Sequence, residues 1–187
     1  MAFNADNGNN PSYQGYLDLI RPRLQQDKFE LSESQQVEGY KVDLFGYKLF
    51  FSTWRINYWA VCQVAYFDTV DVDTVRSFSN AMYEFDKNYK KPIGTYTLRS
   101  FSVLAAQQIS EDAKSYVDGF DGRRFEFARY FTEHPVLAEL GTSNIFHYQK
   151  PGVVARFAQK GTIDAANKYF LHSMTEDATA SDPIEVK

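Results

Sequence analysis

One stretch, residues 40–67, limits what this chain can fold into more than any other: YKVDLFGYKLFFSTWRINYWAVCQVAYF. Its β-branched and aromatic content predicts three consecutive β-strands, with reversals at Gly46 and at Ile56-Asn57. The third strand is largely apolar on both of its alternating faces, from Tyr58 to Tyr66. That pattern is typical of a strand covered on both sides, so we expect a sheet with its middle buried.

A helix is predicted directly after these strands. Asp71 or Asp73 can cap its first turn, because a side-chain oxygen there accepts from free backbone amides. Pro92 and Gly94 end it. Its apolar residues recur every three or four positions and form one stripe: Val75, Phe78, Met82, Phe85 and Tyr89.

The remaining elements follow from the same signals. We predict a first helix from Ser12, then a polar connector before residue 40, and a fourth strand over 95–105. Ser110 caps a short helix, and 123–131 reads as a fifth strand. A helical turn from Pro135, a strand over 144–149 and a last helix complete the order. This order predicts an α/β or α+β fold, with helices packed on a central mixed sheet of about five to six strands.

The length of 187 residues is that of one domain, which we place at 12–174. Residues 1–11 are rich in Asn and Gly and are predicted to be disordered, and 175–187 is predicted to be a flexible acidic tail. The N-terminus lacks the basic and apolar regions of a secretory signal, and no apolar run is long enough to span a membrane. A cytoplasmic protein with no membrane association is the expectation.

The charge balance argues against broad affinity for nucleic acid, because the net charge is −4 and the pI about 5.4. Cys62 is the only cysteine, so no disulfide forms within the chain. It lies in the apolar third strand, which favours a buried, inert thiol. Aromatic residues reach 17% of the chain, which indicates a core of large side chains or an interaction surface.

The opening order α-β-β-β-α-β is also that of the restriction-endonuclease-like core. Such nucleases hold a divalent metal with acidic groups on the second and third strands, and a Glu-x-Lys on the third. Here that place holds Gln63-Val64-Ala65, while Asp43 is on the first strand and Asp68 follows the third. An amide and a methyl group neither chelate a metal nor supply a cation. An active enzyme of this type is therefore not expected, although a catalytically empty relative is an alternative.

The three histidines are His134, His147 and His172, and none has a second ligand at zinc-site spacing. His134 precedes a proline at a predicted helix start, which is a structural placement. His172 closes the last helix. His147 lies on a predicted strand, a rigid mount, and is the histidine we select as a binding residue. No metal and no cofactor are expected.

Segment 123–131 interleaves basic and aromatic residues, and Arg123, Arg124 and Arg129 are its candidate binding residues. Single-strand nucleic-acid binders use such a combination. A half-buried strand gives the same pattern, and we favour that interpretation. A helix start near Thr162 would also hold an anion, but the same residues make an ordinary turn and cap.

Three hypotheses remain, in this order. The first is a domain without catalytic activity that acts by association with a protein partner, including a homo-oligomer. The second is an enzyme with a site assembled from dispersed residues: His147, Asp43, Asp68 or Arg99. The third is a single-strand nucleic-acid binder that uses 123–131.

Overall fold

The structure is a computed structural model, which describes residues 11–50, 57–92, 96–120, 122–126, 129–150 and 156–171. Its helices are α1 (Pro11–Gln26), α2 (Val72–Asp86), α3 (Glu111–Asp118) and α4 (Arg156–Phe170). Its strands are β1 (Glu30–Val37), β2 (Tyr40–Phe50), β3 (Asn57–Tyr66), β4 (Tyr96–Ala106), β5 (Arg123–Glu126), β6 (Arg129–Glu139) and β7 (Asn144–His147). The predicted disorder before residue 11 and the predicted tail at 175–187 lie outside the described residues.

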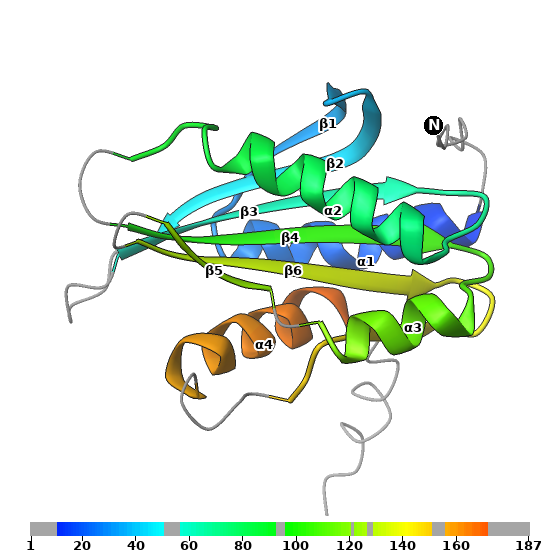
Figure 1. Cartoon of the computed structure of the whole chain (residues 1–187). Helices are drawn as coiled ribbons and strands as arrows, with labels where there is room; N and C mark the ends of the chain where they lie inside the picture. The colour runs from blue at the N-terminus through cyan, green and yellow to red at the C-terminus, as the bar shows by residue number, and fades with distance from the viewer. Residues whose placement is uncertain are drawn as a thin grey trace, which may run out of the picture.

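The described strands form a seven-stranded sheet in the order β1-β2-β3-β4-β6-β5, and β7 also pairs with β6. Strands β1, β2 and β3 are antiparallel neighbours, whereas β3, β4 and β6 run parallel. Parallel neighbours need crossover connections, and α2 and α3 lie in these connections (Figure 1). The predicted mixed sheet with packed helices is confirmed, and so is the opening order α-β-β-β-α-β.

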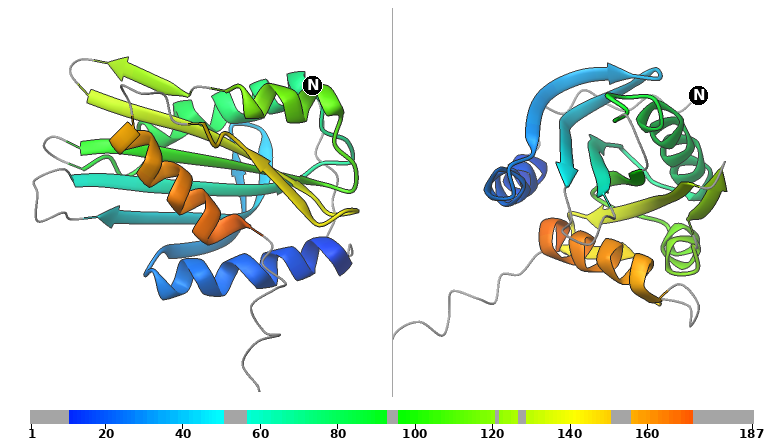
Figure 2. Two further views of the ribbon diagram at one scale, coloured as in Figure 1. Left: turned by 90° about the horizontal axis from the view of Figure 1, so that it is seen from below. Right: turned by 90° about the vertical axis from the view of Figure 1, so that its left-hand side faces the viewer.

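Helices cover both faces of the sheet. Helices α2 and α3 lie on one face, and α1 and α4 on the other (Figure 1 and Figure 2). Strand β3 separates the two cores: Trp59 and Val61 face the α2 side, while Cys62 and Val64 face the α1 side. The prediction that both faces of this strand are covered is therefore confirmed. In the described part of the chain, no helix is both long enough and apolar enough to cross a membrane.

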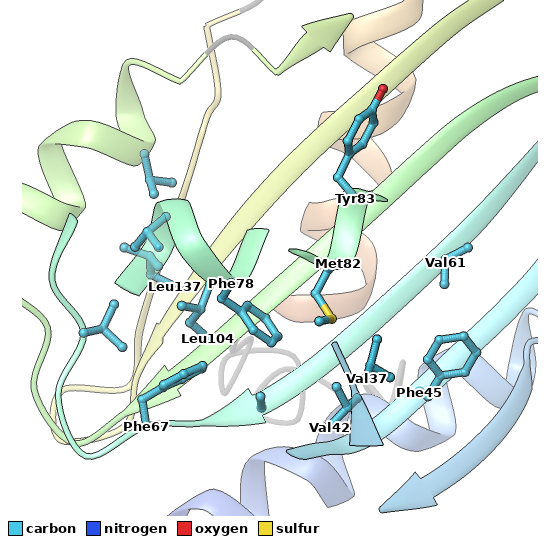
Figure 3. Close-up of a cluster of buried hydrophobic side chains, with 14 of the residues drawn as sticks. Val37, Val42, Phe45, Val61, Phe67, Phe78, Met82, Tyr83, Leu104 and Leu137 are labelled. Atoms are coloured by element: carbon cyan, nitrogen blue, oxygen red, sulfur yellow. The ribbon is translucent and has the colours of Figure 1, made fainter. Parts of the chain in front are cut away.

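Helix α2 forms for the reasons that the sequence indicates. The Asp71 side chain accepts a 2.7 Å hydrogen bond from the Thr74 amide, which caps the helix. Val75 is fully buried, and so are Phe78 and Met82, which Figure 3 shows packed against the sheet. Burying a side chain of this size stabilises the fold by about 1.5–3 kcal/mol.

The predicted reversal at Gly46 is wrong, and so is the predicted connector before residue 40. That connector is β1, an edge strand whose polar composition hides its pairing with β2. The turn lies at Glu38 and Gly39, where Gly39 has a φ of 84°. Gly46 is inside β2, and a Cβ there would lie 2.7 Å from Cys62 Sγ. This glycine therefore serves close packing and not a turn.

Two predictions around β6 are also wrong. Segment 123–131 is not one strand but the hairpin β5–β6, with Glu126 paired to Arg129. Pro135 opens no helical turn, because it lies within β6 beside Ser102 of β4. On its other edge, β6 pairs with β5 up to Thr132 and with β7 from Val136. Pro135 falls between those pairings, where a residue without a backbone donor is tolerated.

Candidate functional site

The two histidines of the described chain meet on the α4 side of β6. His147 is the last residue of β7, and its Nδ1 lies 3.1 Å from Nε2 of His134 in β6. Each residue is only 3% exposed. The sequence singled out His147, but it assigned His134 to a helix start, which is wrong. It missed their contact because the pair forms only through the β6–β7 pairing. His172 lies outside the described residues.

The rest of the site comes from α4, from the chain after β7 and from β4. His147 Nε2 lies 2.9 Å from Oδ1 of Asn167, and His147 Nδ1 lies 3.1 Å from the Tyr148 carbonyl oxygen. The ring of Phe101 packs edge-on against His134, with centroids 5.8 Å apart. The orientation of the two imidazole rings is therefore set by contacts with α4, with the Tyr148 backbone and with β4.

Burial keeps both imidazoles neutral at neutral pH. The pKa of His134 is lowered to about 3, chiefly by loss of hydration and to a smaller extent by the neighbouring His147. Burial also lowers the pKa of His147, against the opposite effect of its bonds to Asn167 and Tyr148. Beside His147, α3 and β7 enclose a cavity of about 410 Å³ whose lining includes Lys114 and Phe146. The site therefore combines two neutral imidazoles with a cavity that is lined in part by His147.

The basic residues selected from the sequence are not brought to this site. Arg123 pairs with Thr132 across the β5–β6 hairpin, and His147 pairs with Val136 on the same edge of β6. Four residues along a strand separate those positions by about 13 Å. Arg124 and Arg129 lie in the same hairpin. The side chains of these three arginines lie outside the described part of the structure.

The dispersed candidates also lie apart from His147. Asp43 accepts a 2.8 Å hydrogen bond from Tyr13 in α1, and Asp68 is exposed beyond the end of β3. Arg99 donates to the Gly161 carbonyl oxygen at 3.3 Å. Helix α4 begins at Arg156, so the predicted helix start near residue 162 is wrong and offers no anion site. None of these contacts involves His147.

Gln63 occupies the strand position at which restriction-endonuclease-like nucleases carry a metal-binding carboxylate, and it is buried in the α2-side core. Gln63 is fully buried opposite Phe45, and its Nε2 donates to Oδ1 of Asp86. Ser100 Oγ donates to the other carboxyl oxygen at 2.6 Å. Within the described ranges, no group of three or more His, Cys, Asp and Glu is placed to hold a metal. The sequence missed Asp86, although its place four residues after Met82 puts it on the buried stripe of α2.

One end of the sheet combines cations with aromatic rings. On the α1–α4 face, Lys48 Nζ lies 4.0 Å from the Phe50 centroid, and Phe50 stacks on Tyr58 at 4.3 Å. The guanidinium of Arg99 covers the Tyr58 ring at 3.9 Å. On the α2 face, the equivalent contacts join Lys87 to Tyr83 and Lys90 to Tyr47 and Tyr89. We call these residues and the exposed Lys91 the basic–aromatic end.

The opposite end of the sheet is acidic. It lies at the carboxyl ends of β3 and β4, where α2 and α3 begin. We call it the acidic end, and its exposed acidic residues are Asp68, Asp71, Asp73, Glu111 and Asp112. The side chains of Asp73 and Glu111 are 91% and 86% exposed, and they pair within their helices with Arg76 at 3.9 Å and Lys114 at 2.8 Å. The helix dipoles favour carboxylates here, and their charge faces solvent.

Comparison with known proteins adds little. No family model matches the chain, and no curated protein matches it. Among solved structures, a repair endonuclease from Pyrococcus abyssi matches with a TM-score of 0.35 and 13% identity. The match covers 69% of this chain and 48% of that one, so the chain spans about half of that protein's length. A likeness of this size supports no inference about activity.

Proposed function

We propose that this chain is a binding domain that associates with further copies of itself, the basic–aromatic end of one copy against the acidic end of the next. The observation that carries the proposal is the separation of exposed charge between the two ends of one sheet. Lys87 and Lys90 pair with Glu84 and Glu30, whereas Lys48 makes no ion pair with any described residue. Complementary charge of this kind sets orientation and speeds encounter between protein surfaces.

The rings of the basic–aromatic end supply the apolar part of such an interface. Phe50, Tyr58 and Tyr89 are half-buried, so each keeps part of its surface in contact with solvent. Aromatic side chains are enriched at the centres of protein interfaces, where they contribute most of the binding energy. The high aromatic content of the chain has a use here beyond core packing.

The arrangement of the two ends defines the symmetry of the assembly. The two lie at opposite ends of the strands. Helix α2 begins at the acidic end and runs back to the basic–aromatic end (Figure 1). A contact between different ends is heterologous, so every copy keeps one end of each kind for another copy. Rings or open chains follow from such a contact, and a closed twofold dimer does not.

The edge of the sheet formed by β1 is a poorer surface for association than the two ends. Strand β1 is polar, and Ser34 interrupts it with a φ of 49°. Its Glu33 is paired with Arg21, at 3.0 Å. Charge and backbone irregularity on an edge strand discourage strand addition. The two ends of the sheet are therefore favoured over its edge.

Light scattering coupled to size-exclusion chromatography tests the proposal, with two double variants that neutralise one end each. The basic-end variant is Lys48→Gln with Lys91→Gln, and the acidic-end variant is Asp73→Asn with Asp112→Asn. The wild-type mass should rise with concentration at low salt and fall to that of one chain at high salt. Each variant alone should be monomeric, and an equimolar mixture should stop at two chains, because one productive contact remains.

Lys150→Gln is the matched control, because it removes an exposed cation whose partner is Asp118, away from both ends. It should associate like the wild type. A wild-type chain that stays monomeric at low salt overturns the proposal. If that monomer binds a labelled single-stranded oligonucleotide in a salt-dependent manner, the nucleic-acid alternative takes its place.

A further inference from the structure

The proton positions around His147 are constrained by its neighbours. In the orientation of the Asn167 amide present in the structure, Oδ1 faces His147 and can only accept, so His147 Nε2 carries the proton and donates to it at 2.9 Å. A neutral imidazole has one N–H group. His147 Nδ1 is therefore left with a lone pair.

That lone pair faces two further atoms that can accept. The Tyr148 carbonyl oxygen lies 3.1 Å from His147 Nδ1 and has no proton to offer. Nε2 of His134 also lies 3.1 Å from it. A proton on His134 can satisfy the contact between the two nitrogens, but the carbonyl oxygen still faces a lone pair. A positive centre beside His147 Nδ1 would satisfy both of the contacts that this nitrogen makes, one with His134 Nε2 and one with the Tyr148 carbonyl oxygen.

The distances suit a metal ion in that place. Imidazole nitrogens bind zinc at about 2.05 Å, and two such nitrogens 3.1 Å apart subtend an angle of about 98° at the metal. This angle lies between those of square and tetrahedral coordination. We propose that His134 Nε2, His147 Nδ1 and the Tyr148 carbonyl oxygen bind a transition-metal ion of the class that imidazole prefers, Zn²⁺, Ni²⁺ or Cu²⁺, with water completing its coordination.

The surroundings have the other properties of such a site. Metal-binding histidines usually donate their second ring N–H to an oxygen atom, and Asn167 accepts from His147 in this way. Asn167 is thus a positioning residue. His147 also lines a cavity of about 410 Å³ between α3 and β7, so the site adjoins a space large enough to hold water.

The ligand set also indicates the type of site. Only two side chains and a backbone oxygen converge, and the described residues add no cluster of three or more His, Cys, Asp and Glu. Closed structural zinc sites have four protein ligands. This site therefore keeps open positions and binds metal reversibly, and the fold does not depend on the ion.

Isothermal titration of the full chain with Zn²⁺ and with Ni²⁺, after dialysis against a chelator, tests the proposal. One ion per chain should bind. His134→Gln and His147→Gln should abolish saturable binding, and Asn167→Ala should weaken it by about ten- to a hundredfold. His172→Gln changes the only other histidine of the chain and should bind like the wild type.

Electron paramagnetic resonance of the Cu²⁺-loaded wild type provides a readout that needs no variant to fold. Its hyperfine structure should report two imidazole nitrogens. A signal from one nitrogen, or metal binding that survives in folded His147→Gln, overturns the proposal. No saturable binding, together with a ¹⁵N spectrum of doubly protonated His147 at neutral pH, also overturns it and places a proton in the position of the metal.

Discussion

Ser100 Oγ donates a 2.6 Å hydrogen bond to the carboxyl group of Asp86 inside the α2-side core, where both residues are fully buried. Gln63 is the other partner of that carboxyl group, so neither partner carries a charge. Burial raises the pKa of Asp86 well above 3.8, although both hydrogen bonds act in the opposite direction. Gln63 Oε1 has no partner among the described atoms, and a turned amide would let it accept the acid proton.

Asp86→Asn should therefore stabilise the protein, and more so at higher pH. The pKa of Asp86 is raised in the folded state, so protonated Asp86 stabilises the fold. This contribution is fully present at pH values below about 3.8, the pKa of the side chain in the unfolded chain. It declines as pH rises to the folded pKa. Across that window the variant should gain about 1.4 kcal/mol on the wild type per pH unit. Urea unfolding at several pH values measures the difference, and Asp73→Asn on the surface should show no such slope.

Gly122→Ala should destabilise the protein, whereas Gly15→Ala should not. A Cβ on Gly122 would lie 1.8 Å from the Glu133 carbonyl oxygen, so the backbone of β6 would have to move. Overpacking of this kind costs about 1–3 kcal/mol or more. Nothing lies within 4 Å of a Cβ on Gly15 in α1, and alanine there should add about 0.5–1 kcal/mol. Thermal unfolding compares the two variants. Equal melting temperatures would contradict the close packing of Gly122 against β6.

The Cys62 thiol should be unreactive in the folded protein. It is fully buried in β3 beside Gly46 of β2, and burial raises its pKa, as does Asp86 to a smaller extent. Thiolates are the reactive species, so a disulfide reagent should modify Cys62 only when the chain opens. The modification rate should rise with urea in parallel with unfolding. Rapid stoichiometric reaction in native buffer would contradict this burial.

Local signals predicted the elements that depend on residues a few positions apart. The caps at Asp71 and Ser110 are present, because a cap bonds to an amide three residues on. Alternation in β3 identified a strand covered on both faces. By contrast, Gly46 was taken for a turn and Pro135 for a helix start. Both residues are explained by contacts with strands distant in sequence, which no local pattern contains.

The sequence by itself determined α2 and α3 with their caps and the buried central strand β3, because periodicity and caps act over short distances. His147 was selected from its strand alone. Its partner His134 is 13 residues away and Asn167 is 20 residues away, so only the tertiary structure decided that they meet. Strand register and helix docking bring such groups together, and both depend on the packing of the whole sheet.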